Sequence, residues 1–172
     1  MKKLVIAEKP SVGREIAKNL LCFDKEKGYT EGPDYIVTWA LGHLVELAQP
    51  QHYSERYKRW SIKDLPMLPE SLDQEVIDES KEQFDVISSL LKRDDISSVV
   101  IATDAGREGE LVARWILKLN NYNGKAERLW ISSQTEKAIK EGFANLKPAE
   151  DYDNLYHAAE CRAAADWYVG MN

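Results

Sequence analysis

Short apolar runs alternate with stretches of helical spacing along most of the chain. The runs predict strands, and apolar residues every three or four positions predict helices. We expect strands at Lys2–Ala7, Tyr35–Leu41, Val99–Ala102 and Ala126–Ile131, with Leu44–Leu47 as a short continuation of the second. We expect helices after a cap at Ser11, at Glu79–Arg93, at Arg107–Leu119, from a cap at Ser133 or Thr135 through Leu146, and at Asp151–Met171. This alternation predicts an α/β fold with a Rossmann-like, mostly parallel sheet and helices on both faces.

The segment Gln49–Pro69 does not follow either periodicity. Its three prolines and its aromatic residues, Tyr53, Tyr57 and Trp60, are typical of an irregular surface excursion. A connection of this length is usually functional or disordered, and the aromatic content favours an ordered one.

Composition limits the class of protein. The 172 residues suit one compact domain with a terminal appendage, and no apolar run reaches membrane-spanning length. The formal net charge of −6 argues against a protein that holds nucleic acid by bulk electrostatics, so a nucleic-acid role must depend on local sites. The two cysteines are too few for a disulfide framework, and we interpret Cys161 as a helix core position. With no signal peptide before Met1, we expect a reducing, cytoplasmic compartment. We also expect a monomer, and no membrane partner because no apolar run is long enough.

The segment from Ser98 to Glu110 carries the most chemical information. It reads as a buried strand that ends in an acidic, glycine-containing turn and passes directly into a helix. A divalent cation would explain why Asp104, Glu108 and Glu110 gather there, because hard cations prefer oxygen ligands and the carboxylates otherwise repel one another. The alternative is that Asp104 caps the helix and the glutamates favour its positive first turn.

A second acid follows the first predicted strand. In a doubly wound sheet the carboxyl ends of neighbouring strands converge, so Glu8 and Asp104 are expected to meet around one ion. Mg²⁺ takes one or two carboxylates and completes its shell with water and substrate phosphate, which suits Glu8, Asp104 and Glu108. The alternative is that Glu8 and Lys9 form an ordinary solvated turn pair.

Five ordered segments resemble a known family. They are Ile6–Ser11, Thr38–Leu44, Arg56–Trp60, Thr103–Glu110 and Arg162–Asn172. Together they resemble the amino-terminal segment of the bacterial DNA topoisomerase III family of type IA topoisomerases, over essentially the whole chain. The resemblance implies a TOPRIM fold and ATP-independent cleavage and religation of single-stranded DNA with Mg²⁺.

The resemblance also implies roles for individual residues. Glu8 matches a proposed general acid and base near the scissile phosphate, and Lys9 matches a lysine that contacts this phosphate. Asp104 and Glu108 match the first and last acids of an Asp-x-Asp-x-Glu motif that binds Mg²⁺. Gly106 replaces the middle acid, which predicts weaker metal binding or a single ion. Glu110 lies further into the helix, and we expect it to point elsewhere.

Four further residues are predicted to contact DNA. His43 follows a glycine at a strand end, where it would donate to a phosphate or be satisfied by local backbone groups. Trp60 would stack on a base or form a small satellite core. Arg107 would face phosphate or pair with Glu108. Arg162 matches a family arginine that touches the DNA backbone, and the neighbouring Asp166 and Trp167 would share that motif or only pack and pair.

We predict a TOPRIM domain at residues 1–148 and the truncated start of a helical domain at 149–172. The nucleophilic tyrosine of the family lies in a Tyr-Pro-Arg-Thr setting, which none of the eight tyrosines has. We therefore expect a topoisomerase segment that needs the remainder of its chain and cannot relax DNA by itself. Two alternatives are a self-sufficient TOPRIM nuclease or phosphoesterase, against which Gly106 argues, and a non-catalytic nucleic-acid-binding module.

Overall fold

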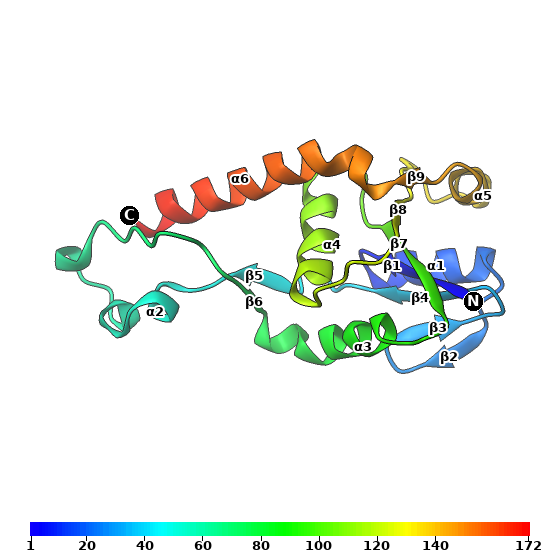
Figure 1. Cartoon of the computed structure of the whole chain (residues 1–172), viewed down its shortest axis with the longest axis horizontal. Coiled ribbons are helices and arrows are strands. Elements are labelled where there is room, and N and C mark those ends of the chain that lie inside the picture. Colours follow the sequence, from blue (N-terminus) through cyan, green and yellow to red (C-terminus); the bar gives the residue numbers. More distant parts are fainter.

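The computed structural model describes all 172 residues and is built on a seven-stranded sheet (Figure 1). Its four central strands are parallel and lie in the order β4 (Tyr35–Trp39), β1 (Lys2–Ala7), β7 (Ile96–Ala102) and β8 (Ala126–Arg128). Antiparallel strands flank them: β3 (Tyr29–Glu31) and β2 (Asp24–Glu26) on one side, and β9 (Lys147–Pro148) on the other. The predicted α/β fold with a mostly parallel central sheet is confirmed.

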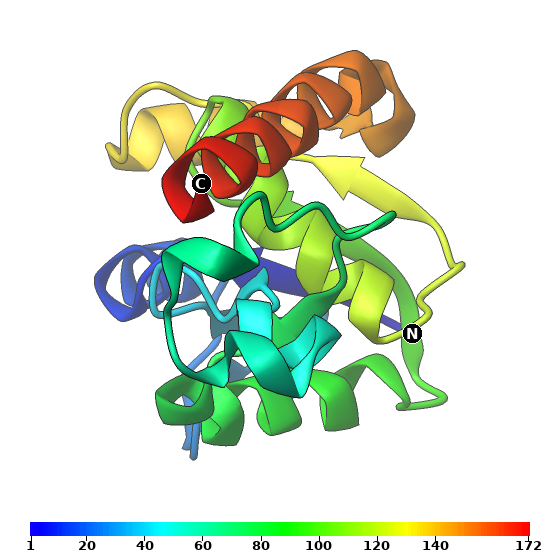
Figure 2. The same ribbon diagram turned by 90° about the vertical axis from the view of Figure 1, so that its left-hand side faces the viewer.

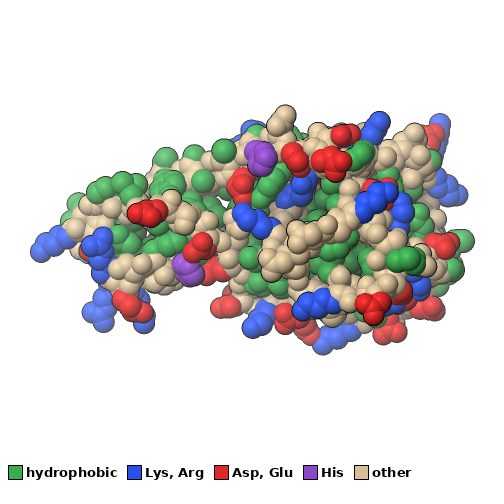
Figure 3. Space-filling view, in the orientation of Figure 1, with side chains coloured by type: hydrophobic (Ala, Val, Ile, Leu, Met, Phe, Trp, Pro, Cys, Tyr) green, Lys and Arg blue, Asp and Glu red, His purple; other side chains and the backbone are tan.

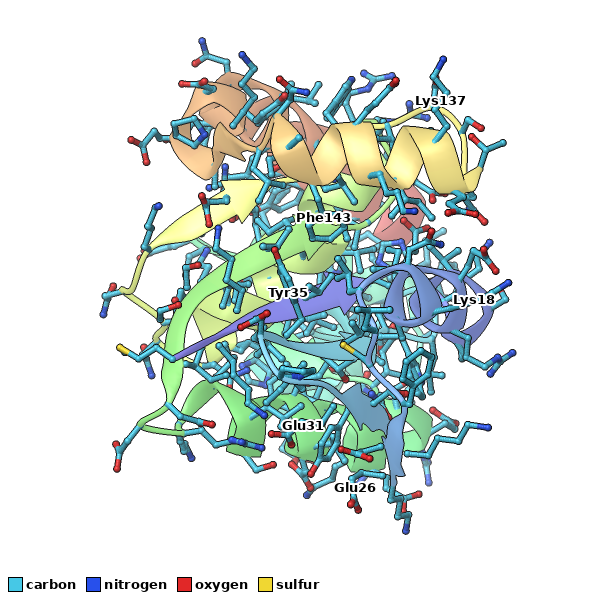
Figure 4. All side chains as sticks on the ribbon, turned by 90° about the vertical axis from the view of Figure 1, so that its right-hand side faces the viewer. Lys18, Glu26, Glu31, Tyr35, Lys137 and Phe143 are labelled. Carbon is cyan, nitrogen blue, oxygen red and sulfur yellow. The ribbon has the colours of Figure 1, made fainter.

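Helices cover both faces of the sheet because successive residues of a strand point to opposite sides. On β1, Leu4 and Ile6 pack in one cluster with α3 (Lys81–Leu91), α4 (Arg107–Leu119) and α6 (Asp153–Met171). Val5 and Ala7 pack in a second cluster with α1 (Pro10–Asn19) and α5 (Glu136–Ala144). Figure 4 shows Tyr35 of β4 pointing toward Phe143 of α5, an edge-to-face pair with ring centroids 5.6 Å apart. The central strands are therefore covered on both sides and read as continuous apolar runs.

Two local predictions were wrong, and one hairpin was not predicted. Ser11 does not cap α1, because the helix begins at Pro10, whose fixed φ suits the first helical position, and Lys9 is the N-cap residue. Leu44–Leu47 does not continue β4, since the chain turns at Gly42, with φ of +86°, and β5 (Val45–Leu47) pairs with β6 (Gln74–Val76) in a separate two-stranded sheet. The hairpin of β2 and β3 was not predicted, because each strand is only three residues long and β2, at the sheet edge, is fully exposed and charged.

Residues 49–73 form an ordered arm beside the carboxyl-terminal half of α6 (Figures 1 and 2). The arm contains three short helices, α2 (Pro50–Tyr53), η1 (Glu55–Lys58) and η2 (Ile62–Asp64). Trp167 of α6 donates from Nε1 to the Ala48 carbonyl at 3.0 Å, and the Tyr168 hydroxyl donates to the Pro69 carbonyl at 2.8 Å. These contacts hold the arm against α6, so the excursion is ordered as predicted.

Helix α6 buries few of its residues. Two short turns, η3 (Asp78–Ser80) and η4 (Ala149–Tyr152), precede α3 and α6 respectively. Only Ala159 and Trp167 are buried on α6, and Cys161 is exposed, which contradicts its interpretation as a core position. Two residues along a helix correspond to a rotation of about 200°, so Cys161 lies on the face opposite Ala159.

None of the helices combines the length and the apolar character that crossing a membrane would require.

Candidate functional site

Glu8 and Asp104 lie together at the carboxyl edge of the sheet. Glu8 follows β1, and Asp104 follows β7 after Thr103. The chain leaves β1 for β4 on one side, whereas β7 lies on the other side, so this edge is a topological switch point where ligands of such sheets bind. The backbone N–H of Asp104 donates to Oε2 of Glu8 at 2.8 Å. The predicted meeting of the two strand ends is therefore observed.

The turn that carries Asp104 folds back onto the first turn of α4. The hydroxyl of Thr103 donates to the Gly109 carbonyl at 2.7 Å. Only glycine fits at position 109, because a Cβ there would lie 1.9 Å from the Asp104 carbonyl oxygen. The glycine of the Glu-Gly-Glu sequence thus permits the close contact that fixes the Asp104 backbone.

Asp104 is not a helix cap. The N-cap residue of α4 is Gly106, and no side chain caps this helix. The Asp104 carboxylate is exposed and forms no hydrogen bond or ion pair within the chain. The capping alternative is therefore wrong for Asp104, although Glu108 and Glu110 do lie in the positive first turn.

Glu108 and His43 face each other. His43 follows the left-handed Gly42, and its Nε2 lies 3.5 Å from Oε2 of Glu108. Its partner is thus a carboxylate and not a local backbone group. The structure places Glu8 with Asp104, and Glu108 with His43. It contains no cluster of three or more His, Cys, Asp or Glu side chains arranged to hold a metal ion.

Two cationic residues flank these acids. Lys9 directly follows Glu8 and precedes α1, and its side chain is exposed and without an ionic partner. Arg107 is the first residue of α4, is exposed, and forms no ion pair with Glu108. The salt-bridge alternative for Arg107 is absent from this structure, and both cations face solvent beside the acidic edge.

A cleft of about 370 Å³ extends the site toward α6. It is lined by His43, which precedes β5, and by residues of β5, α4 and α6, among them Glu108, Trp115, Arg162, Asp166 and Trp167. Arg162 pairs with Asp166 across one helical turn at 3.6 Å, and Trp167 is buried. Three of the residues predicted from the sequence, His43, Glu108 and Arg162, therefore line one cleft.

Trp60 lies away from this cleft, in the arm. Its side chain is 71% exposed, so it does not form a satellite core. Exposed basic residues surround it in the sequence: Arg56, Lys58, Arg59 and Lys63. Figure 3 shows blue side chains gathered at the left-hand end of the molecule, where this arm lies. An acidic chain thus carries a local basic and aromatic surface at its tip.

Sequence reasoning missed Arg128, the largest fully buried side chain. It pairs with Glu110, which is 0% exposed and also accepts from Nε of Arg114 at 3.2 Å. Burial lowers the pKa of the Arg128 guanidinium, and the neighbouring Glu110 carboxylate opposes this shift. Glu110 points away from the acidic edge, as expected. The sequence could have indicated this pair, because Arg128 lies inside a predicted strand of a sheet covered on both faces, where charged side chains occur only when paired.

Comparison with known proteins agrees with this geometry. The Toprim domain family model matches residues 3–134. The chain is 58% identical to DNA topoisomerase 3 of Bacillus thuringiensis (strain Al Hakam) and 56% identical to that of Bacillus subtilis (strain 168), over 171 residues in each case. These alignments cover 99% of the chain and 24% of each relative, so the chain spans about a quarter of their length.

A solved structure has a similar fold. Full-length topoisomerase I from Thermotoga maritima matches with a TM-score of 0.57 and 20% identity, over 85% of this chain and 21% of that one. The resemblance to bacterial topoisomerase III is confirmed, and the fold agrees with a topoisomerase domain. The chain belongs to the Toprim domain family.

Proposed function

We propose that this chain is the metal- and phosphate-binding part of a type IA DNA topoisomerase, acting on single-stranded DNA. The observation that supports this most is the hydrogen bond between Glu8 and the Asp104 backbone at the switch point of the sheet. It brings two acids from separate strands to one edge in a chain that is 56–58% identical to proteins named DNA topoisomerase 3. The nucleophilic tyrosine is proposed to come from a part of the protein outside these 172 residues.

The donor set fits Mg²⁺. Mg²⁺ is usually bound by one or two protein carboxylates, and this edge of the sheet supplies two. Water and a DNA phosphate oxygen would complete the coordination shell. Asp104 would bind directly because its carboxylate is exposed and has no internal partner. Glu8 would contribute through its free lone pairs, and Glu108 would join when its carboxylate leaves His43. When bound, Mg²⁺ supplies positive charge that neutralises the phosphate.

Glu8 and Lys9 are the proposed catalytic residues. Glu8 would give a proton to the leaving sugar oxygen in cleavage and take it back in religation, as general acid and base. Lys9, exposed and unpaired next to it, would donate charge-assisted hydrogen bonds to the scissile phosphate. The Asp104 N–H restricts the Glu8 carboxylate, which keeps this proton carrier at the edge of the site.

DNA would run from the acidic edge along the cleft. His43 and Arg162 line that cleft, and Arg107 lies at the start of α4 beside Glu108. These three side chains would contact phosphates and fix the path of the backbone. Trp60 would stack on a base at the tip of the arm, where stacking tolerates any sequence.

A chimera tests the proposal. The matching 171 residues of Bacillus subtilis DNA topoisomerase 3 would be replaced by this chain, and relaxation of negatively supercoiled DNA would be measured with Mg²⁺. We expect relaxation by the chimera, loss of relaxation in its Glu8→Gln variant, and none from the 172-residue chain alone. A folded chimera without activity, or relaxation by the isolated chain, would contradict the proposal.

A further inference from the structure

Arg128 lies beneath the turn that carries Asp104. Its Nη1 donates to the carbonyls of Thr103 and Leu129, each at 2.7 Å, and its Nη2 donates to the Asp104 carbonyl at 2.7 Å. A longer contact of 3.3 Å joins Nη1 to the Ile101 carbonyl. One guanidinium thus ties together the ends of β7 and β8, using the fork of donors that only arginine provides.

The surroundings of Arg128 hold it in place. Its Nε pairs with Glu110, and its guanidinium carbon lies 5.0 Å from the centre of the Trp130 ring. Trp130 in turn stacks on Tyr152 with ring centroids 4.8 Å apart. With the carboxylate on one side and the indole on another, the side chain is 0% exposed and cannot leave without unfolding its surroundings.

Electrostatics alone would not favour a guanidinium beside a metal-binding carboxylate. A guanidinium bonded to the Asp104 backbone repels a divalent cation at the Asp104 carboxylate, so its charge weakens metal binding. A buried ion pair is also weak evidence for stability, because desolvation offsets much of the attraction. The feature that neither charge nor stability explains is the direct hydrogen bond to the residue proposed to bind metal.

We propose that Arg128 is a positioning residue for the metal site, with Glu110 as its anchor. By fixing the Asp104 carbonyl, it holds the backbone so that the Asp104 side chain points to solvent beside Glu8. This inference rests on the proposed function, since it concerns the same metal site.

The test measures binding of Mn²⁺ to the 172-residue chain. The electron paramagnetic resonance signal of free Mn²⁺ reports how much of the ion is unbound. Arg128→Met removes the fork, and Arg128→Lys keeps the charge with a single donor group. The double variant Glu110→Gln/Arg128→Met leaves no unpaired buried charge, because Arg114 retains Asp153 at 2.9 Å. Arg93→Met is the matched control, since Arg93 is an ion-paired arginine remote in the fold, beside Glu31 and Asp95. Circular dichroism identifies the folded variants.

We expect Mn²⁺ affinity to fall about 10- to 100-fold in the Met, Lys and double variants and to stay unchanged in Arg93→Met. For Arg128→Met the direction is decisive, because loss of a nearby positive charge by itself would tighten binding. Unchanged or tighter binding by the folded Arg128 variants, with wild-type binding that Asp104→Asn removes, would overturn this inference alone. Absence of Asp104-dependent binding in the wild type would instead overturn the proposed metal site and this inference with it.

A second measurement needs no variant and covers the case in which all of them unfold. In the wild-type chain, Mg²⁺ is titrated while the nitrogen-proton NMR signals of the Arg128 Nε and the Asp104 amide are followed. We expect both signals to shift with the same midpoint, because the two groups share one hydrogen-bonded unit. An Arg128 signal that stays fixed while the Asp104 signal saturates would overturn the proposal.

Discussion

The Asp104 backbone N–H donates a hydrogen bond of 2.8 Å to the Glu8 carboxylate. The two residues are 96 positions apart in the sequence, and only the adjacency of β1 and β7 brings them together. The bond leaves the Asp104 carboxylate free, so the pair presents two acids to a ligand while one backbone group limits the motion of Glu8.

Gly106→Asp should strengthen Mg²⁺ binding. The φ of Gly106 is 171°, an extended conformation open to any residue, and no atom lies within 4 Å of an added Cβ. A further carboxylate at the start of α4 should raise Mg²⁺ affinity about tenfold through its charge. Isothermal titration calorimetry measures this, with Gly106→Asn as the neutral control of the same shape. Equal affinities for the Asp and Asn variants would show that position 106 does not face the ion.

Gly109→Ala should destabilise the fold and weaken metal binding together. The added Cβ would lie 1.9 Å from the Asp104 carbonyl oxygen, so the turn must move away from α4. Overpacking of this kind costs about 1–3 kcal/mol or more, measurable as a lower urea midpoint. Gly170→Ala is the control, because nothing lies within 4 Å of its Cβ and alanine favours a helix. Equal midpoints for the two variants would refute the close contact at Gly109.

The pair Arg93 and Glu31 should make stability depend on acid pH. Hydrogen bonds from Arg93, with a smaller contribution from Lys2, lower the pKa of Glu31 from its ordinary value of 4.5, and Arg93 likewise lowers the pKa of Asp95 from 3.8. A lowered carboxyl pKa stabilises the fold above the unfolded value, and this contribution is lost as the pH falls through the folded value. Thermal unfolding from pH 6 to pH 3 should therefore show a smaller loss of Tm in Arg93→Gln than in the wild type.

Lys27→Gln provides the control for that series. Lys27 pairs with Glu82, but the two side chains are 83% and 71% exposed, so solvent screens their interaction. The pH dependence of this variant should match that of the wild type. If Arg93→Gln also matches the wild type, the ion pairs around Glu31 do not contribute to acid stability.

Trp60→Ala should lower the affinity of the chimera for single-stranded DNA without changing its stability. Stacking of a base on an aromatic ring contributes about 1–3 kcal/mol, and the exposed Trp60 ring has no core contacts to lose. Fluorescence anisotropy with a labelled oligonucleotide measures the affinity. Ile62→Ala is the matched control in the same arm, because it removes a side chain that is 75% exposed but has no aromatic face. Equal affinities would exclude stacking by Trp60.

The parts of the fold that were predictable are those in which burial dictates the residue type. The central strands are covered on both faces and therefore appear as apolar runs, and Arg107–Leu119 was predicted with the bounds that α4 has. The edge strand β2 and the partner strand β6 are three residues long and partly or fully exposed, so no periodicity marks them. Cys161 was misplaced because α6 has no clear apolar face from which burial could be inferred.

The candidate site also has features that the sequence predicted and features that it did not. The proximity of Glu8 and Asp104 was predictable because both follow buried strands that were expected to be parallel and neighbouring. The direction of the Glu108 side chain was not predictable, because it depends on where the turn at Gly42 places His43. The contacts of Arg128 to backbone carbonyls depend on tertiary geometry that no residue pattern encodes.

The most direct test of the metal site is the anomalous scattering of Mn²⁺ in crystals of this chain. Mn²⁺ takes the same oxygen ligands as Mg²⁺, and its anomalous signal distinguishes it from a water molecule. We predict an anomalous peak coordinated by the Asp104 carboxylate and bridged to Glu8, directly or through water. A peak bound elsewhere, or no peak beside an ordered Asp104 at saturating Mn²⁺, would contradict the account.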